Sequence, residues 1–582
     1  MKHSARLASG TLLFAFLALR CTELEGADDW FPPTGAGAAG GALSGAGGTD
    51  GGEASSAGSQ AMGGSASGQG GAGGDAPASG NGGAAGEADP SAGAGGEGGS
   101  RDDCIDPTGF DGRGCYACVA NDIFTLENAC TDAICTHFDN ERRLVKLLPN
   151  GDLPALPAPS GAGGMAGSGG AGARGAAGNG GSAGAGTGVA CEELVASGTA
   201  VHITGSSAAK PFLQQIAQQL AGEGVYIVYT STGSCVGVDA VVNGTLMTTG
   251  VAPAPAVTAT VWENSASSGR ACDLPSGGVP ADLGISDVFA ETCPGFELTN
   301  LDGLRIRDAH GPIQTMAFAV PTNSPHLQIS AQAAYFVFGF GAEGGVLDPS
   351  ASNPIWHDES LIFQRSASSG TQAMLASAIG VAPGRWRGKS HKTSDDVAAA
   401  LQAAAGDETS AKQAIGILAA DYVDTRNLRA QIRMLAYQDS RQSCALFPDS
   451  TASARDKQNV RDGHYPIWGP LHLLYKVDRS GNPLNEANRQ AVTDIVGYLS
   501  GTKALPNGVK LLDVYAQSGL IPECAMRVTR TSDGRAITAY RPPNPCSCVF
   551  EAKATGSTRC KACTVQGDCS ADEGCSQGYC EK

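Results

Sequence analysis

The sequence predicts an α/β protein with two lobes, flanked by small cysteine-rich modules and by segments that do not fold. Short apolar strand patterns alternate with helix patterns from about residue 191 to residue 525, which is typical of parallel sheets with crossover helices. A region of that length exceeds one hydrophobic core, so two lobes are expected. Glycine accounts for 83 of the 582 residues and cysteine for 19, and the excess of glycine is local.

The main body divides into expected strands and helices in chain order. In the first expected helix, Phe212, Ile216 and Leu220 fall on one face, which is the pattern of an amphipathic helix. Strands are expected at 201–204, 225–230, 283–285, 316–321, 361–363, 414–420 and 432–437. Helices are expected at 207–221, 236–242, 330–339, 371–380, 395–405 and 488–501.

The flanking segments differ from the main body in composition. Residues 22–100 and 158–190 consist mostly of Gly, Ala and Ser, cannot bury enough apolar surface to offset chain entropy, and are expected to be disordered tethers. Residues 101–157 carry five cysteines, and the tail 526–582 carries seven from Cys546 onward. Both are expected to be small modules held by disulfides, because their cores are too small to fold without crosslinks.

The N-terminus, residues 1–21, has the features of an export signal. An apolar stretch of 13 residues, Leu7–Leu19, follows a basic start and is too short to span a bilayer. Cys21 ends a stretch, Ala18–Cys21, that resembles a lipoprotein lipobox, so we expect a lipid anchor there, with plain secretion as the alternative. If Cys21 is acylated, an even number of cysteines is left to pair, as expected in the periplasm or at the cell surface.

The net charge limits the classes of partner. Thirty-nine basic and 57 acidic side chains leave a charge of −18, which argues against a nucleic-acid partner because such a partner requires a basic face. A small anion is not excluded, since its binding is decided by a few groups inside a cleft.

Three turns rich in Ser, Gly and Thr each follow an expected strand and open an expected helix. They are Thr204–Pro211, Thr230–Gly237 and Arg365–Thr371. Helix N-termini present unpaired N–H groups and the positive end of the helix dipole, so they hold anions. Any one turn is also explained by ordinary helix capping. Three together, one of them carrying the donor fork of Arg365, favour an anion site.

The residues in and around these turns resemble a known family. From about 200 to 505, the chain resembles the substrate-binding proteins of phosphate ABC transporters, which have the type II periplasmic-binding-protein fold. The resemblance lies in five stretches that occur in the family's order: ITGSSAAKPF, YTSTGSCVGV, ADLGISDVF, FQRSASSGTQAM and GHYPIWGPLHLLYK.

The resemblance implies a set of ligand-binding residues. Asp282 would take the role of an aspartate that contacts the ligand; a buried acceptor there favours phosphate, which carries a proton, over sulfate, which does not. The alternative is that Asp282 caps a turn. The first loop departs from the family by placing Ala208 where a hydroxyl residue is usual. The ligand-binding residues expected are Ser206, Ser207, Ser234, Asp282, Arg365, Ser369, Gly370 and Thr371.

The cysteines of the main body are expected to be oxidised. Cys272 and Cys293 flank Asp282 by 10 and 11 residues, and a bridge between them would pin that carboxylate. Cys235 lies in the second anion loop, where a disulfide is favoured over a nucleophile because no base is evident. The C-x-x-C pairs Cys115–Cys118 and Cys560–Cys563 are also interpreted as disulfide cysteines rather than zinc or redox sites.

These observations favour a non-catalytic receptor. We expect an exported, lipid-anchored protein that captures inorganic phosphate or a related tetrahedral oxyanion between its lobes, without cofactor or metal, and with an ABC permease as a further partner to consider. The alternative is a surface adhesion or scaffold protein that kept the fold and lost the ligand. An enzyme with Ser369 or Cys235 as nucleophile is less favoured, because no Ser-His-Asp or Cys-His arrangement is recognisable.

Overall fold

The computed structural model describes residues 101–158, 188–195, 198–249, 258–296, 300–350, 353–534 and 536–581. The expected signal segment, Cys21 and the tether 22–100 lie outside the described residues, as does nearly all of the linker 158–190. The described residues from 104 onward belong to one compact unit. In the part of the chain that the structure describes, no helix is both long and apolar enough to cross a membrane.

One large mixed sheet runs through the unit. Its strand order is β12-β11-β13-β9-β17-β8-β4-β5-β6-β7, with β14 paired to β9. The strands are β4 (Thr199–Gly205), β5 (Val225–Ser231), β6 (Ala259–Val261), β7 (Arg270–Cys272), β8 (Leu283–Ser286), β9 (Ile306–Pro321), β11 (Ile362–Arg365), β12 (Lys389–His391), β13 (Ile415–Ala419), β14 (Ile432–Met434) and β17 (Trp468–Lys476).

The strand order repeats one motif in two lobes. In the first lobe, β4 lies between β5 and β8 and is parallel to both. In the second lobe, β11 lies between β12 and β13 and is parallel to both. Each lobe therefore has the order second-first-third, which is typical of doubly wound α/β folds. An antiparallel strand follows in each, β17 beside β8 and β9 beside β13.

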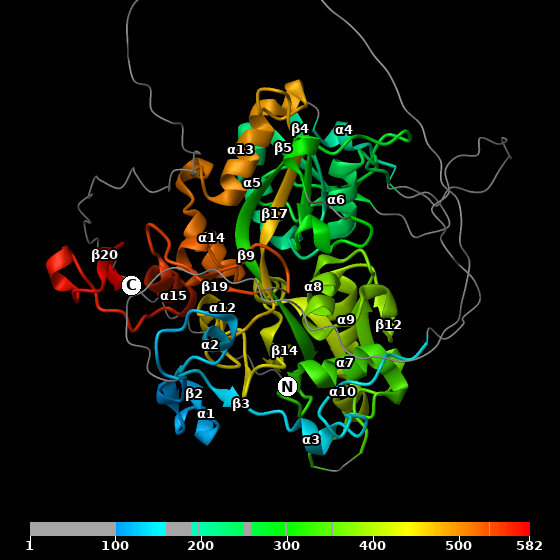
Figure 1. Ribbon diagram of the computed structural model, residues 1–582. Helices are drawn as coiled ribbons and strands as arrows, with labels where there is room; N and C mark the ends of the chain where they lie inside the picture. The colour runs from blue at the N-terminus through cyan, green and yellow to red at the C-terminus, as the bar shows by residue number, and fades with distance from the viewer. Residues whose placement is uncertain are drawn as a thin grey trace, which may run out of the picture. The chain divides into compact units, whose positions relative to one another are not determined.

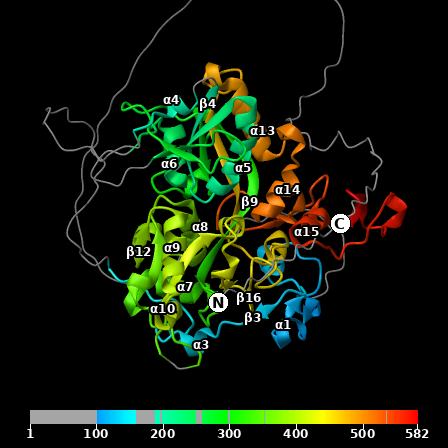
Figure 2. The ribbon, with the colours of Figure 1, turned by 180° about the vertical axis from the view of Figure 1, so that it is seen from behind.

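The long strand β9 connects the lobes. Residues 306–315 of β9 pair with β17, and residues 316–319 pair with β13. Figures 1 and 2 show β9 running from the region of α5 and α6 to the region of α7, α8 and α9. Two lobes, each with a parallel sheet and an antiparallel strand beside it, form the type II periplasmic-binding-protein arrangement. The expected fold class is therefore confirmed.

The helices cover the sheet with apolar faces that the sequence pattern predicted. Phe212, Ile216 and Leu220 are buried in the core of the first lobe, together with side chains of α13 and α14. Burying each such side chain stabilises the fold by about 1.5–3 kcal/mol. The helices of the two lobes are α5 (Lys210–Leu220), α6 (Ser234–Val242), α7 (Ala331–Phe340), α8 (Gly370–Ile379), α9 (Ser394–Ala404), α10 (Glu408–Gln413), α11 (Ala420–Thr425), α13 (Arg489–Ser500) and α14 (Leu511–Ser518).

The two cysteine-rich regions are built onto the lobes. Strand β3 (Cys135–Thr136) of the N-terminal region pairs with β16 (Ala445–Leu446) of the main body. Helix α15 (Ser547–Thr555) of the tail packs against α14. The other elements are β1 (Ile105–Asp106), α1 (Gly109–Gly112), β2 (Cys115–Tyr116), α2 (Ile123–Glu127), α3 (Asn140–Arg143), α4 (Cys191–Leu194), β10 (Gln328–Ser330), β15 (Ala436–Gln438), α12 (Gln458–Arg461), β18 (Val528–Thr529), β19 (Thr538–Ala539), β20 (Gly574–Ser576) and β21 (Tyr579–Glu581).

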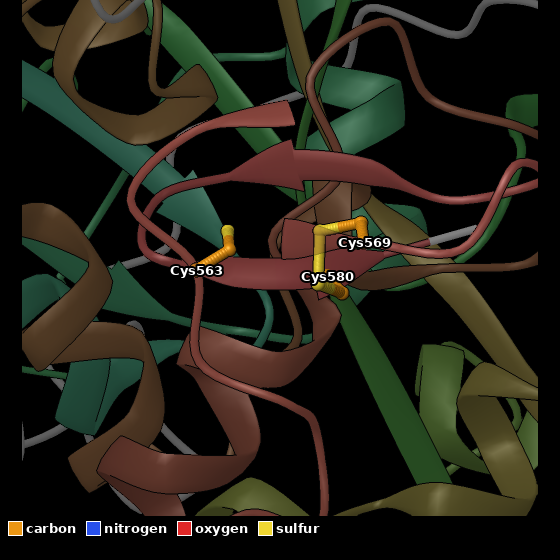
Figure 3. A group of neighbouring side chains, drawn as sticks. All are labelled: Cys563, Cys569 and Cys580. Atoms are coloured by element: carbon orange, nitrogen blue, oxygen red, sulfur yellow. A yellow bond between two sulfur atoms is a disulfide. The ribbon is translucent and has the colours of Figure 1, made fainter. Parts of the chain in front are cut away.

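Nine disulfides pair all the cysteines that the structure describes. They are Cys104–Cys118, Cys115–Cys130, Cys135–Cys444, Cys191–Cys272, Cys235–Cys293, Cys524–Cys546, Cys548–Cys560, Cys563–Cys575 and Cys569–Cys580. The last of these is seen in Figure 3, beside Cys563. This degree of oxidation is typical of proteins outside the reducing cytoplasm.

The expected Cys272–Cys293 bridge is wrong. Cys272 is bonded to Cys191, which begins helix α4, and Cys293 is bonded to Cys235 in α6. The prediction rested on the symmetric spacing of the two cysteines about Asp282 in the sequence. In the structure, Cys272 ends β7 at the edge of the sheet, whereas Cys293 follows the carboxyl end of β8 in its interior. The expectation that Cys235 forms a disulfide is confirmed.

Candidate functional site

Three helices begin at the carboxyl ends of parallel strands. Helix α5 follows β4, α6 follows β5, and α8 follows β11. None of these three helices has a side-chain hydrogen bond at its N-cap, whereas α7 and α9 are capped by Ser330 and Thr393. In the first turn, however, Ser206 Oγ accepts from the backbone N–H groups just before α5, so capping explains part of that turn. The N-termini of α6 and α8 have no such side-chain cap and keep their attraction for an anion.

Arg365 provides a fixed positive charge at the end of β11. The residue is 2% exposed, and its guanidinium donates from Nη1 to Ser394 Oγ at 2.9 Å and from Nη2 to the Lys392 carbonyl at 2.8 Å. Burial lowers its pKa to about 10, and the nearby carboxyl of Asp287 opposes that shift. Arg365 thus stays charged at neutral pH and is held in one orientation.

Asp287 lies at the carboxyl end of β8 and is the acidic group of the cluster. Its backbone N–H donates to Ser234 Oγ at 3.1 Å, and Ser206 and Ser234 act as hydrogen-bond partners of its carboxyl. The side chain is fully buried; burial raises the pKa above its ordinary value, and Arg365 pulls in the opposite direction. Asp287 therefore lies beside both serine loops and close enough to Arg365 to feel its charge.

The first loop contributes Ser206 and Ser207, both buried. Ser206 Oγ accepts from the backbone N–H groups of Ala208 and Ala209 at 3.1 and 3.2 Å. Ser207 Oγ lies 3.3 Å from Ser394 Oγ, which also accepts from Arg365. This chain of hydroxyl contacts reaches from the first lobe to the second.

The loop before α8 closes directly against the first lobe. The backbone N–H of Cys235 donates to the Ser368 carbonyl at 3.0 Å. A Cβ added at Gly370 would overlap the Ser234 hydroxyl and lie 2.9 Å from the Asp287 Cβ, so only glycine allows this approach. Ser369 and Thr371 are buried beside it.

Several polar atoms in this cluster have no hydrogen-bond partner among the described residues. They include Arg365 Nε, Thr371 Oγ1 and Asp287 Oδ1. A buried polar group without a partner costs about 1–3 kcal/mol. The set contains a cationic donor, a hydroxyl and a carboxyl acceptor, and a small ligand that both accepts and donates hydrogen bonds would satisfy all three.

Asp282, expected as a ligand contact, lies outside the cluster that the other expected residues form. It precedes β8, whereas Asp287 follows it, and five residues of extended chain separate the two by about 16 Å. Asp282 Oδ2 accepts from the backbone N–H of His202 and from Asn488 at 2.9 Å each, and Oδ1 accepts from Asn485 at 2.7 Å. Burial pushes the pKa of Asp282 up, but these hydrogen bonds outweigh burial and hold it below the ordinary value.

The structure brings together the other expected residues. The missed residue, Asp287, stands five positions after Asp282 in the same quoted stretch. One signal in the sequence could have found it: ligands of α/β folds bind outside the carboxyl ends of the parallel strands, and Asp287 follows the strand whereas Asp282 precedes it.

Comparisons with known proteins concern the fold. No protein-family model and no curated protein matches the chain. A phosphate ABC transporter substrate-binding protein with bound phosphate from Clostridium perfringens is similar at 14% identity, over 56% of this chain and 99% of that one, with a TM-score of 0.36. An ABC-type phosphate transport receptor from Vibrio cholerae is similar at 13% identity, over 55% and 99%, with a TM-score of 0.34. The reduced OxyR regulatory domain from Pseudomonas aeruginosa is similar at 7% identity, over 51% and 96%, with a TM-score of 0.27. The fold assignment stands on the strand order given above.

Proposed function

We propose that this protein is a non-catalytic receptor that binds phosphate or a related tetrahedral oxyanion between its two lobes. The observation that carries the proposal is that the three turns at the N-termini of α5, α6 and α8 meet around one buried arginine. Helix N-termini and a guanidinium fork are both matched to an oxyanion, because each offers several N–H donors to oxygens that carry negative charge. The binding set is Ser206, Ser207, Ser234, Asp287, Arg365, Ser369, Gly370 and Thr371.

The contact between the lobes supports enclosure of the ligand. Ser206, Ser234 and Asp287 come from the first lobe, whereas Arg365 and Gly370 come from the second. Because the two halves of the set lie on different lobes, binding would draw the lobes together and exclude water. Exclusion of water strengthens the attraction between Arg365 and the anion.

Asp287 supplies selectivity. A protonated phosphate donates a hydrogen bond to a carboxylate, so the carboxylate and the anion share one proton. Sulfate brings no proton, and the carboxylate then has to take one up from solution or face a like charge. The site is therefore expected to prefer phosphate and arsenate, which share this chemistry, over sulfate.

We also propose that the protein is exported and anchored to a membrane. Nine disulfides agree with an oxidising compartment. We propose that residues 1–21 direct export, that Cys21 carries the lipid anchor, and that an ABC permease receives the ligand. Mass spectrometry of the N-terminal peptide from membranes tests the anchor, since an unmodified Cys21 would contradict it.

Isothermal titration of the full oxidised chain with phosphate, arsenate and sulfate tests the receptor function. We expect one site per chain, with phosphate and arsenate bound more tightly than sulfate. If none of the three anions gives a heat of binding at millimolar concentration, the receptor proposal fails and the scaffold interpretation takes its place.

A further inference from the structure

A second polar cluster lies on the ribbon formed by β9 and β17. The two strands are antiparallel, and His310 of β9 lies directly opposite His472 of β17. Asp308 precedes His310 by two residues, and alternation along a strand places both on the same face. Cross-strand neighbours on one face interact directly, so the strand pairing itself brings the three side chains together.

The distances within the cluster are close to those of a metal site. His472 Nδ1 lies 2.8 Å from Asp308 Oδ2, and His310 Nε2 lies 3.9 Å from the same oxygen. The three ligand atoms lie within 4.8 Å of one another. Ligands of a tetrahedral ion with bonds of about 2.0–2.1 Å stand roughly 3.3–3.4 Å apart, a value between the two measured distances.

A buried ion pair explains only part of this geometry. His472 and Asp308 form such a pair, but Asp308 Oδ1 and His472 Nε2 are buried without a hydrogen-bond partner among the described residues. His310 adds a second imidazole, which a simple ion pair does not require. Its side chain is about half exposed, so it can turn by the small amount that coordination needs.

The surroundings favour a cation. The carboxyls of Glu291 and Asp533 act electrostatically on His472, and that of Glu523 acts on His310. The ring of Phe289 packs edge-on against His472, with ring centroids 4.3 Å apart, and forms an apolar wall on one side. Such a wall restricts imidazole orientation and keeps water from the buried ligands.

One residue of the cluster, His310, lines a small pocket. His310 and Glu523 line a space of about 40 Å³ together with residues of the 526–540 segment. That volume holds a water molecule, which needs about 10–15 Å³. A water molecule in this space would thus be available for a fourth position around an ion held by the cluster.

We propose that Asp308, His310 and His472 form a binding site for a divalent transition-metal ion such as Zn²⁺. Two imidazoles and one carboxylate are the ligands that Zn²⁺, Co²⁺ and Ni²⁺ accept, whereas Ca²⁺ and Mg²⁺ require a shell of oxygens. The ion would join the two strands that connect the lobes. This inference does not depend on the oxyanion proposal.

Two other clusters have ligand atoms equally close together, but they contain disulfide-bonded cysteines and are not candidate metal sites. Cys563, Cys569 and Cys580 lie together in the tail, but each sulfur is already in a disulfide, and Figure 3 shows the bond between the last two. The same holds for Cys115 and Cys130 beside Asp106, because those two sulfurs are bonded to each other. A metal requires the thiolate form, which these cysteines do not have.

The test is titration of the full oxidised chain with ZnCl₂. The protein is purified without a polyhistidine tag, treated with a chelator and dialysed into phosphate-free buffer. We expect one Zn²⁺ to bind per chain, Zn²⁺ to raise the melting temperature, and CaCl₂ to give no binding. His310→Ala should weaken Zn²⁺ binding by at least about 100-fold, the upper end of the effect of losing an outer-shell partner.

The control is His357→Ala, since His357 is exposed and stands outside the cluster. It should leave Zn²⁺ binding unchanged. His310 is half exposed, so His310→Ala is expected to keep the metal-free melting temperature, and Asp308→Asn provides a second ligand variant. The proposal is overturned if the wild-type chain does not bind Zn²⁺ below millimolar concentration, or if His310→Ala binds it as tightly as the wild type does.

Discussion

Replacing Arg365 should remove most of the affinity for an oxyanion. Within the cluster, its guanidinium is the fixed positive charge, and the Ser and Thr hydroxyls and backbone N–H groups are neutral donors. Truncating one partner of a buried, hydrogen-bonded charge pair costs about 2–5 kcal/mol. At 1.4 kcal/mol per tenfold change, Arg365→Ala should weaken phosphate binding by roughly 30-fold to several thousand-fold.

Isothermal titration with phosphate measures this loss, and two further variants interpret it. Arg365→Lys restores the charge without the donor fork, so it should recover only part of the affinity. Arg433→Ala is the matched control, because Arg433 also donates to backbone carbonyls of the second lobe, those of Thr322 and Ser324, but stands outside the cluster. If Arg365→Ala keeps its melting temperature and binds phosphate as tightly as the wild type does, the site is wrongly assigned.

The remaining predictions concern Asp287 and Gly370 of the cluster and Asp282, which lies outside it. Asp287→Asn supplies a donor as well as an acceptor, so titrations should show a reduced preference for phosphate over sulfate, with phosphate affinity lowered by at most about tenfold. In the wild type, burial raises the pKa of Asp287, so the carboxylate takes up a proton more easily in acid. Sulfate affinity should therefore rise relative to phosphate affinity as pH falls. Asp282→Asn should leave binding unchanged and lower the free energy of unfolding by about 1–3 kcal/mol in urea titrations. That difference should shrink as pH falls below the ordinary pKa of 3.8, because the folded-state pKa of Asp282 is depressed and its contribution is lost on protonation; a difference that grows in acid would contradict the assignment. Gly370→Ala should abolish phosphate binding while the chain still melts cooperatively, since the added Cβ overlaps Ser234 and keeps the lobes apart; unchanged affinity would show that this closure is not needed.

The local patterns of the main body predicted much of its secondary structure. Helix α5 was expected at 207–221 and spans Lys210–Leu220, and α8 was expected at 371–380 and spans Gly370–Ile379. Their apolar periodicity and turn residues are local properties, so they can be recognised without knowledge of the fold. The expected strand 316–321 is only the end of β9, because the first half of β9 carries polar residues, Gly311 and Pro312 without a regular apolar pattern and is a strand through its pairing with β17.

Tertiary structure decided which residues of a motif share a site. Asp282 and Asp287 are five positions apart in one stretch. Only the direction of β8 shows that the second lies beside the serine loops while the first binds Asn485 and Asn488. A strand rises about 3.3 Å per residue, so two side chains five positions apart lie at opposite ends of a short strand such as β8.

The sequence by itself determined the class of fold, the cysteine-rich composition of the flanking regions and the three Ser/Gly/Thr turns with their arginine, because these follow from local composition and periodicity. The disulfide partners and the Asp308–His310–His472 cluster were decided only by the tertiary structure. Cys235 and Cys293 are 58 residues apart, and Asp308 and His472 are 164 apart. Contacts at such separations depend on strand order and register, which are set by the packing of the whole sheet. The sequence spacing of the residues that meet therefore does not predict them.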